Sequence, residues 1–328
     1  MNSPSVKQGQ APEKVKPTPI PVTVVAGFLG AGKTTLVNHI LKGDHGLRIA
    51  VVVNDFGSIN IDAELITDVG EGMVSLANGC ICCVIRSDLI SAVLQLADRP
   101  ERPDHIVIES SGVADPASVE RAFMVPEVWS SVRFEGVISV VDGDQSPERV
   151  AEHGGLAEQQ VRGGDLIILN KVDLATDEQL AAVRSWINKI KPGAEIFEAS
   201  HCLLPIELLL GSVKGDRPTG LPVSIDNSES HGHAFESWAY ESQQPLQLDL
   251  FQALLKHLPP SLIRAKGFLF TADKPHQRLT LQFVGRRATI AVNGSWNGQL
   301  PETRLVFIAK SETVNFQAVE QALKECQT

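Results

Sequence analysis

Short apolar runs alternate with longer stretches of helical pattern over the first two-thirds of the chain. Five of these runs are rich in Val, Ile and Leu, which is typical of strands buried on both faces. They span residues 22–26, 49–53, 106–108, 137–141 and 166–169. Because helix-like stretches separate them, the sequence predicts an α/β fold over residues 20–212, with a mostly parallel sheet and helices on both faces.

The last third of the chain has a different pattern. Residues 213–233 are rich in Gly, Pro, Ser, Asp and His, which is typical of a linker. A helix is then expected near residues 246–257 and another near residues 314–325, with strand-like runs between them. These runs span residues 267–271, 279–284 and 288–292. The pattern predicts a small α+β domain over residues 234–328.

Length and charge limit the class of protein. A chain of 328 residues is long enough for about two domains. Its net charge is −10 and it has no basic patch, so a nucleic-acid partner is not expected. Residues 1–19 lack the apolar core of a signal peptide and are expected to be a disordered tail. No apolar run approaches the roughly 20 residues of a membrane span, and we expect a cytoplasmic protein.

The first chemical motif is GFLGAGKT, which follows the strand-like run at residues 22–26. It matches the phosphate-binding pattern G-x-x-x-x-G-K-[ST] at Gly27, Gly32, Lys33 and Thr34, and a helix-like stretch follows it. Main-chain N–H groups in such a loop point at phosphate oxygens, and the helix N-terminus favours an anion. Lys33 is expected to reach the β- and γ-phosphates and Thr34 to ligate Mg²⁺. The other expected nucleotide contacts of this loop are Gly30, Ala31 and Thr35.

The second motif is NKVD, which follows the run at residues 166–169. In an open α/β sheet, the ends of such strands bind ligands. Asn170, Lys171 and Asp173 match the guanine-reading pattern N-K-x-D of P-loop GTPases. The Asp173 carboxylate can accept hydrogen bonds from N1–H and N2–H₂ of guanine. Adenine has neither donor, so such a site can discriminate by a factor of about 10⁴.

Two further segments are expected near the γ-phosphate. The strand at residues 106–108 ends in Glu109, a candidate for holding Mg²⁺ or its water, and Gly112 follows it. The segment NDFGSINID follows the second strand and is predicted to be the first switch, with Asp55 or Asp62 a further candidate for the magnesium site. The bland alternatives are a solvated strand end for Glu109 and a simple turn for the switch segment.

The sequence GCICC places Cys80, Cys82 and Cys83 within four positions. Thiolates are soft ligands that suit zinc, Cu(I) and iron–sulfur clusters. Three thiols leave one position of a tetrahedral site open, as a carrier of metal needs, or to be filled by a residue from another element. The alternative is that one or two of these cysteines are buried and inert. His231 and His233 could capture metal loosely, although a plain linker is the simpler interpretation of their segment. Cys202 and Cys326 are isolated and carry no prediction.

In this order, PVTVVAGFLGAGKTTLVNHIL, VVVNDFGSINID, GCICC, IESSGVADP and LNKVDL resemble the CobW family of P-loop GTPases. The stretch RAKGFLF resembles that family's C-terminal domain. The resemblance covers roughly residues 20–325. It implies a GTPase that binds zinc or cobalt at the CxCC site and delivers it to a client metalloprotein. Many members have Glu and a further acid where this chain has Asp55 and Ser58.

The leading hypothesis is therefore a GTP-hydrolysing metallochaperone that uses GTP and Mg²⁺ and carries Zn²⁺ or Co²⁺, with zinc favoured. Its predicted catalytic set is Lys33, Thr34, Asp55 and Glu109. A nucleotide-dependent homodimer is a candidate assembly. One alternative is a metal sensor or adaptor with a vestigial GTPase. Another is a maturation factor for a single cobalt enzyme, such as nitrile hydratase, or a factor in cobalamin assembly.

Overall fold

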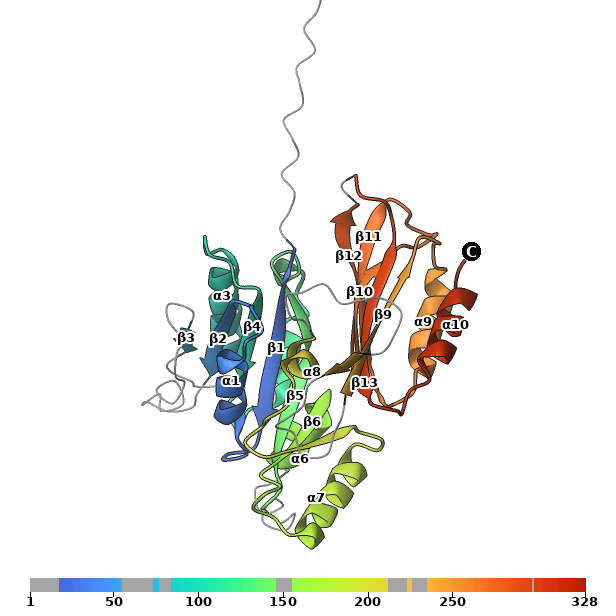
Figure 1. Ribbon diagram of the computed structural model, residues 1–328. Coiled ribbons are helices and arrows are strands. Elements are labelled where there is room, and N and C mark those ends of the chain that lie inside the picture. Colours follow the sequence, from blue (N-terminus) through green and yellow to red (C-terminus); the bar gives the residue numbers. More distant parts are fainter. Residues whose placement is uncertain are drawn as a thin grey trace, which may run out of the picture.

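The computed structural model describes residues 18–54, 73–76, 84–145, 155–211, 223–225, 235–296 and 298–328. Two β-sheets stand side by side in it (Figure 1). Within these residues, the first sheet has seven strands in the order β3-β2-β4-β1-β5-β6-β7, and every neighbouring pair is parallel. The strands are β1 (Ile20–Gly27), β2 (Ile49–Asn54), β3 (Met73–Leu76), β4 (His105–Glu109), β5 (Val132–Asp142), β6 (Leu166–Asn170) and β7 (Ile196–Ala199).

Helices cover both faces of this sheet, which confirms the predicted α/β fold. On one face, α1 (Lys33–Lys42) and α8 (Ile206–Leu210) pack against alternate strand residues such as Val25 and Val107. The residues between them, such as Val24 and Ile108, face the other side. That side is covered by α3 (Val84–Ala97), α4 (Pro116–Ala122), the short 3₁₀ helix η1 (Pro126–Val128), α6 (Leu156–Gly163) and α7 (Asp177–Ile190). Because both faces are buried, the strands are apolar at successive positions.

The second sheet is antiparallel and, among the described residues, has six strands in the order β12-β11-β10-β13-β9-β8. The strands are β8 (Val223–Ile225), β9 (Phe235–Ser242), β10 (Leu262–Leu269), β11 (Gln277–Val284), β12 (Arg287–Ser295) and β13 (Thr303–Lys310). Two helices, α9 (Leu248–His257) and α10 (Phe316–Glu325), cover one face. This arrangement is the predicted α+β domain.

Some elements of the second sheet differ from the sequence prediction. The short strand β8 pairs with β9 although it lies inside the range expected to be a linker. The strand expected at residues 267–271 begins earlier, at Leu262, and ends at Leu269. Arg264 and Lys266 interrupt its apolar pattern, and both contact the buried carboxylate of Glu135 on the first sheet. The two polar residues that make this strand hard to recognise from the sequence therefore form contacts between the two sheets.

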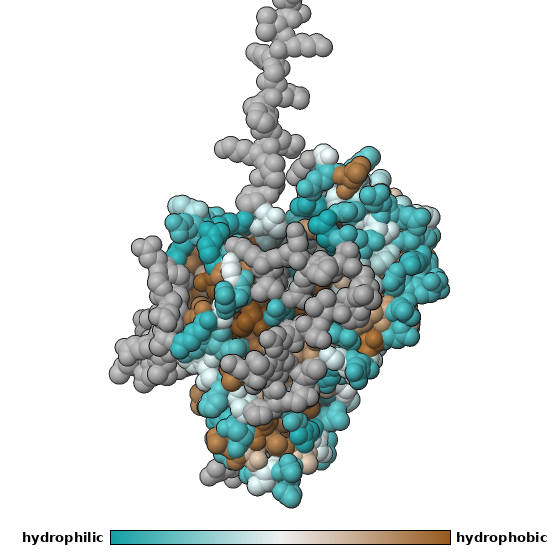
Figure 2. Space-filling view, in the orientation of Figure 1, coloured by the Kyte–Doolittle hydropathy of each residue, from teal (hydrophilic) through white to brown (hydrophobic). Residues whose placement is uncertain are grey.

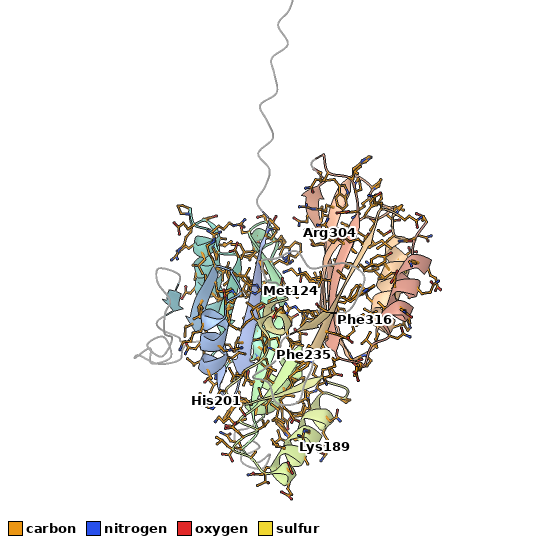
Figure 3. All side chains as sticks on the ribbon, in the orientation of Figure 1. Met124, Lys189, His201, Phe235, Arg304 and Phe316 are labelled. Atoms are coloured by element: carbon orange, nitrogen blue, oxygen red, sulfur yellow. The ribbon has the colours of Figure 1, made fainter. Side chains whose placement is uncertain are left out.

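The two sheets share one hydrophobic cluster. Phe235, Ile263, Val284 and Ile308 of the second sheet pack with α1 and α8 on the same face of the first sheet. Figure 3 shows Phe235 between the two sheets and Phe316 on the helix-covered side of the second sheet. The second domain thus lies directly against the elements that surround the first domain's strand ends.

The outer surface of the second domain is mostly hydrophilic in the view of Figure 2. Within the ranges described above, no helix is both long enough and apolar enough to cross a membrane.

Candidate nucleotide site

The loop between β1 and α1 holds the predicted phosphate-binding motif, and two of its glycines are required by geometry. Gly27 has a φ of 143°, and a Cβ there would lie 2.3 Å from the main-chain oxygen of Val140. Gly32 has a φ of 111°, and its Cβ would lie 2.4 Å from Nδ2 of Asn170. A side chain at either position would strain the backbone and clash with a neighbouring strand end.

Lys33 is the first residue of α1 and is buried within this loop. Its Nζ donates a hydrogen bond to the main-chain oxygen of Phe28 at 3.2 Å, so the ammonium lies across the loop. The first turn of α1 contains no acidic residue. A cation and a helix N-terminus therefore converge where the sequence predicts the phosphates.

Thr34, in the first turn of α1, meets Glu109 at the carboxyl end of β4. The Thr34 hydroxyl donates to Oε1 of Glu109 at 2.7 Å, and Glu109 is 2% exposed. Glu109 ends β4, which pairs in parallel with β1. A hydroxyl and a carboxylate are hard oxygen donors, so this pair fits Mg²⁺. Glu109 is buried, so it is not the solvated strand end of the alternative interpretation.

Gln160 of α6 was not predicted, yet it joins two loops of the site. Its Oε1 accepts a hydrogen bond from the main-chain N–H of Gly27 at 2.9 Å, and its Nε2 donates to the main-chain oxygen of Ala114. Ala114 lies just after Gly112, whose Cβ would come within 2.8 Å of the main-chain nitrogen of Leu29. The segment after β4 therefore packs tightly against the phosphate loop.

Asn170 connects the guanine motif to two other loops. Its Nδ2 donates to the main-chain oxygen of Ala31 at 2.9 Å, and its Oδ1 accepts from the main-chain N–H of Cys202 at 2.9 Å. Asn170 is 2% exposed, so both bonds are shielded from water. The phosphate loop, the end of β6 and the segment after β7 are therefore held together by one side chain.

Lys171 and Asp173 complete the motif at the end of β6. Lys171 has a φ of 63°, and its Nζ lies 2.7 Å from Oδ2 of Asp142 at the end of β5. Asp173 is exposed, as is Leu174 beside it. The carboxylate of Asp173 is thus accessible to a base at the same sheet edge as the phosphate loop.

Cys202 carries no prediction from sequence, and the structure gives its backbone a role in the site. Its Sγ lies 3.5 Å from the main-chain oxygen of Gly32, and the residue is fully buried. Burial raises the pKa of the Cys202 thiol to about 12, so the thiol stays protonated. Its contribution is packing and the N–H bond to Asn170. Figure 3 shows its neighbour His201 at the lower end of the first sheet.

Several predicted site residues lie outside the described residues. They are Asp55, Asp62, Cys80, Cys82, Cys83, His231 and His233. Elsewhere in the chain, over the ranges that the structure describes, no group of three or more His, Cys, Asp or Glu side chains is arranged to hold a metal ion.

Comparisons with known proteins agree with this geometry. Residues 21–198 match the family described as "CobW/HypB/UreG, nucleotide-binding domain", and residues 235–327 match "Cobalamin synthesis protein cobW C-terminal domain". The chain is 35% identical to a protein of Pseudomonas aeruginosa named "Zinc chaperone CobW", over 89% of this chain and 88% of that protein. It is 32% identical to "Zinc chaperone YjiA" of Escherichia coli, over 88% of this chain and 94% of that protein.

Among solved structures, the chain is similar to the Zn(II)-bound YjiA GTPase from E. coli. The sequence identity is 24% and the TM-score 0.41, over 94% of this chain and 99% of that chain.

The phosphate loop, the hydrogen-bonded Thr34–Glu109 pair and the guanine motif on a parallel sheet define a P-loop GTPase. With both of its domains matched along nearly the whole chain, the protein belongs to the CobW/HypB/UreG family.

Proposed function

We propose that this GTPase is a zinc chaperone that couples the binding and hydrolysis of GTP to the binding and delivery of zinc. The cargo site in this proposal is formed by Cys80, Cys82 and Cys83. Two relatives that align with most of the chain are named zinc chaperones, which supports zinc as the cargo. Three thiolates suit zinc and leave a fourth position for a client's ligand to enter.

The order of strands at the carboxyl edge of the first sheet carries the proposal. Val53 of β2 pairs with Glu109 of β4, and Asn54 of β2 pairs with Leu76 of β3. The switch segment leaves the sheet after β2 and the cysteine segment leaves it after β3. Neighbouring strands are about 4.8 Å apart, so both segments start within about 10 Å of the Glu109 position. A change at the γ-phosphate is therefore close enough to alter both.

In this proposal, each residue at the phosphate end of the site has its own role. Lys33 binds the β- and γ-phosphates, while the N–H groups of Gly30, Ala31, Gly32 and Thr35 surround them. Thr34 and Glu109 hold Mg²⁺, which supplies neutralisation of phosphate charge when it is bound. Gly112 lies by the γ-phosphate, and Asp55 of the switch segment is the further acidic candidate.

The base end selects guanine. Asp173 accepts from the guanine N1–H and N2–H₂, and Asn170 and Lys171 fix the loop that presents it. In the GTP state we expect the switch segment to be ordered and the three thiols to be gathered. Hydrolysis of GTP then releases the switch segment and the three thiols, and zinc passes to the client.

The test is a zinc titration against a competing chelator, with GDP or a non-hydrolysable GTP analogue bound. We expect approximately one zinc per chain and tighter binding in the GTP state. By linkage, zinc must then raise the affinity for GTP relative to GDP by the same factor. Equal zinc affinities in the two nucleotide states would refute the coupling.

The cysteine assignment needs a matched pair of variants. The triple change Cys80→Ser, Cys82→Ser, Cys83→Ser is expected to abolish tight zinc binding. Cys326→Ser is the control, because Cys326 is buried at the end of α10, on the second domain. Tight binding that survives the triple change would move the metal site elsewhere, with His231 and His233 tested next. The same titration with Co²⁺ decides between the two metals.

Three further expectations stay predictions of the sequence. They are the client metalloprotein, the nucleotide-dependent homodimer and the cytoplasmic location. Sedimentation of the protein with GDP and with the GTP analogue tests the second of these directly.

A further inference from the structure

The segment between β7 and α8, residues 200–205, lies beside the guanine motif and is called the base loop below. Ala199, the last residue of β7, pairs with Asn170 of the guanine motif. The N–H of Cys202 donates to Oδ1 of Asn170, as described above. At its far end, the main-chain oxygen of Leu204 lies 2.7 Å from Nε2 of His39 on α1. The base loop is therefore tied to the guanine motif and to the helix that begins at Lys33.

The helix that follows the base loop is held at its other end by the second domain. The main-chain oxygens of Leu208 and Leu209 accept hydrogen bonds from Nη1 of Arg264 at 3.1 and 2.8 Å. Carbonyls in the last turn of a helix lack partners within the helix, and a cation there also complements the helix dipole. Gly211 ends α8 with a φ of 68°, and a Cβ there would lie 2.1 Å from Nε of Arg264. The guanidinium thus lies directly against the end of α8.

A carboxylate of the first sheet fixes this guanidinium in place. Nη2 of Arg264 donates to Oε2 of Glu135 at 2.7 Å, and the two side chains are 3% and 0% exposed. Burial opposes ionisation of Glu135, but the charges of Lys266 and Arg264 outweigh it and hold its pKa well below its usual range. Arg264 therefore joins three elements: its own strand β10, strand β5 of the first sheet and helix α8.

Apolar packing makes α8 responsive to the second domain. Leu208, Leu209 and Leu210 are at most 1% exposed. They belong to the same cluster as Phe235, Ile263 and Ile308 of the second sheet. A helix of five residues has little stability of its own. Its position therefore depends on contacts with both sheets and on the two bonds from Arg264.

We infer that Arg264 is a positioning residue for guanine recognition, through which the second domain holds α8 and the base loop against the guanine motif. Arg264 acts through α8 and contacts no nucleotide. Loosening this contact is expected to weaken nucleotide binding at the base end and to leave the phosphate end intact. By linkage, a bound guanine nucleotide in turn strengthens the contact between the domains.

The first test is Arg264→Lys, which keeps the charge next to Glu135 but has one nitrogen in place of Nη1, which bonds the carbonyls, and Nη2, which bonds the carboxylate. We expect the Kd for GDP and the KM for GTP to rise about tenfold, which is about 1.4 kcal/mol at 25 °C, while kcat changes less than twofold. Binding of a fluorescent GDP analogue and steady-state hydrolysis measure the two quantities.

The matched control is Arg287→Lys. Arg287 also joins the domains, through Asp165 and Glu120, but it has no hydrogen bond to α8 among the described contacts. Its Kd for GDP is expected to stay within twofold of the unchanged protein. An equal loss of affinity in both variants would attribute the effect to domain contact in general and overturn the specific role of Arg264.

Two measurements cover the case in which Arg264→Lys does not fold. In Arg264→Met, an apolar side chain of similar length replaces the guanidinium, and Glu135 keeps its ion pairs with Arg133 and Lys266. The same tenfold rise in the Kd for GDP is expected in it. Hydrogen exchange of the unchanged protein gives an independent result. GDP should slow amide exchange at residues 200–211 and at Arg264. If GDP changes exchange at neither place, the inference is refuted. If Arg264→Lys lowers kcat and leaves the KM for GTP unchanged, that result also contradicts the inference.

Discussion

Asn170 donates a hydrogen bond to the main-chain oxygen of Ala31 at 2.9 Å, so the guanine motif and the phosphate loop are bonded directly to each other. The same side chain accepts from the N–H of Cys202. One residue thus holds three loops that come from distant parts of the sequence. A nucleotide that orders any one of these loops also restrains the other two.

Asn170→Ala is expected to weaken GTP and GDP alike by at least about tenfold. It leaves a buried carbonyl and a buried N–H without partners, at a cost of about 1–3 kcal/mol each, so the melting temperature should also fall. Calorimetric titration and thermal unfolding measure the two effects. Asn188→Ala is the control, because the bond that Asn188 Oδ1 accepts from the N–H of Gly193 is exposed. Unchanged affinity in Asn170→Ala would mean that the three loops hold their positions without this side chain.

Asp173 should set the choice of base. The unchanged protein is expected to bind GTP at least about a hundredfold more tightly than ATP, because only guanine can donate to the carboxylate. Asp173→Asn should weaken GTP and admit xanthosine triphosphate, whose C2 carbonyl can accept from the new amide. Competition binding in Mg²⁺ buffer compares the three nucleotides. Asp177→Asn is the control for the loss of one negative charge, because Asp177 is an exposed residue in the first turn of α7. Equal GTP and ATP affinities in the unchanged protein would exclude guanine reading.

Lys33→Ala should abolish hydrolysis of GTP and greatly weaken triphosphate binding, since it removes the cation expected at the β- and γ-phosphates. The fold should persist, because the described bond of Nζ, to the main-chain oxygen of Phe28, lies within the phosphate loop. Phosphate release and circular dichroism measure activity and fold. Lys42→Ala is the control, at the exposed end of the same helix. Normal turnover in Lys33→Ala would place the active site elsewhere.

Acid should destabilise the protein through His105. This residue is buried, and its Nε2 lies 2.9 Å from the Thr23 hydroxyl. Burial lowers its pKa from 6.5 to about 3, although the charge of Glu135 acts in the opposite direction. Between these two values the unfolded chain binds a proton that the folded chain does not. Stability therefore falls as pH falls through this window, by up to about 1.4 kcal/mol per pH unit.

The variant His105→Gln isolates this contribution. Glutamine can still hydrogen-bond to Thr23 but does not titrate, so its free energy of unfolding should fall less steeply between pH 6 and pH 4. Urea unfolding at several pH values measures both slopes. Because the acidic groups of the protein titrate in both variants, the difference between the slopes belongs to His105. Identical slopes would mean that His105 does not bind this proton on unfolding.

Local patterns predicted part of this structure, and the reason differs from element to element. The strands β1, β2, β4, β5 and β6 are buried on both faces, so each contains a continuous apolar run that can be recognised alone. β9 and β13 carry polar residues such as Glu241 and Arg304 on an exposed face, and neither was predicted. β13 is a strand because it pairs with β10 on one side and β9 on the other. A local sequence pattern does not show which strands pair.

The nucleotide motifs were predictable for a related reason. Lys33, Thr34 and the N-K-x-D residues occur at fixed spacings, because one loop must place them around one ligand. Other contacts join residues far apart in the sequence. Gln160 bonds to Gly27 across 133 residues, Cys202 to Asn170 across 32, and Arg264 to Glu135 across 129. A single sequence has no spacing rule for such contacts. The fold had to bring these residues together before their roles could be recognised.

The hydrophobic cluster shared by the two sheets has a consequence for synthesis of the chain. Its members include Phe197 and Leu208 of the first domain and Ile308 of the second. The first domain leaves the ribosome before Ile308 does, so the part of this cluster that the second domain covers is exposed until then. We therefore expect the nascent GTPase domain to depend on chaperones until the second domain has emerged, and to acquire full affinity for GTP only afterwards.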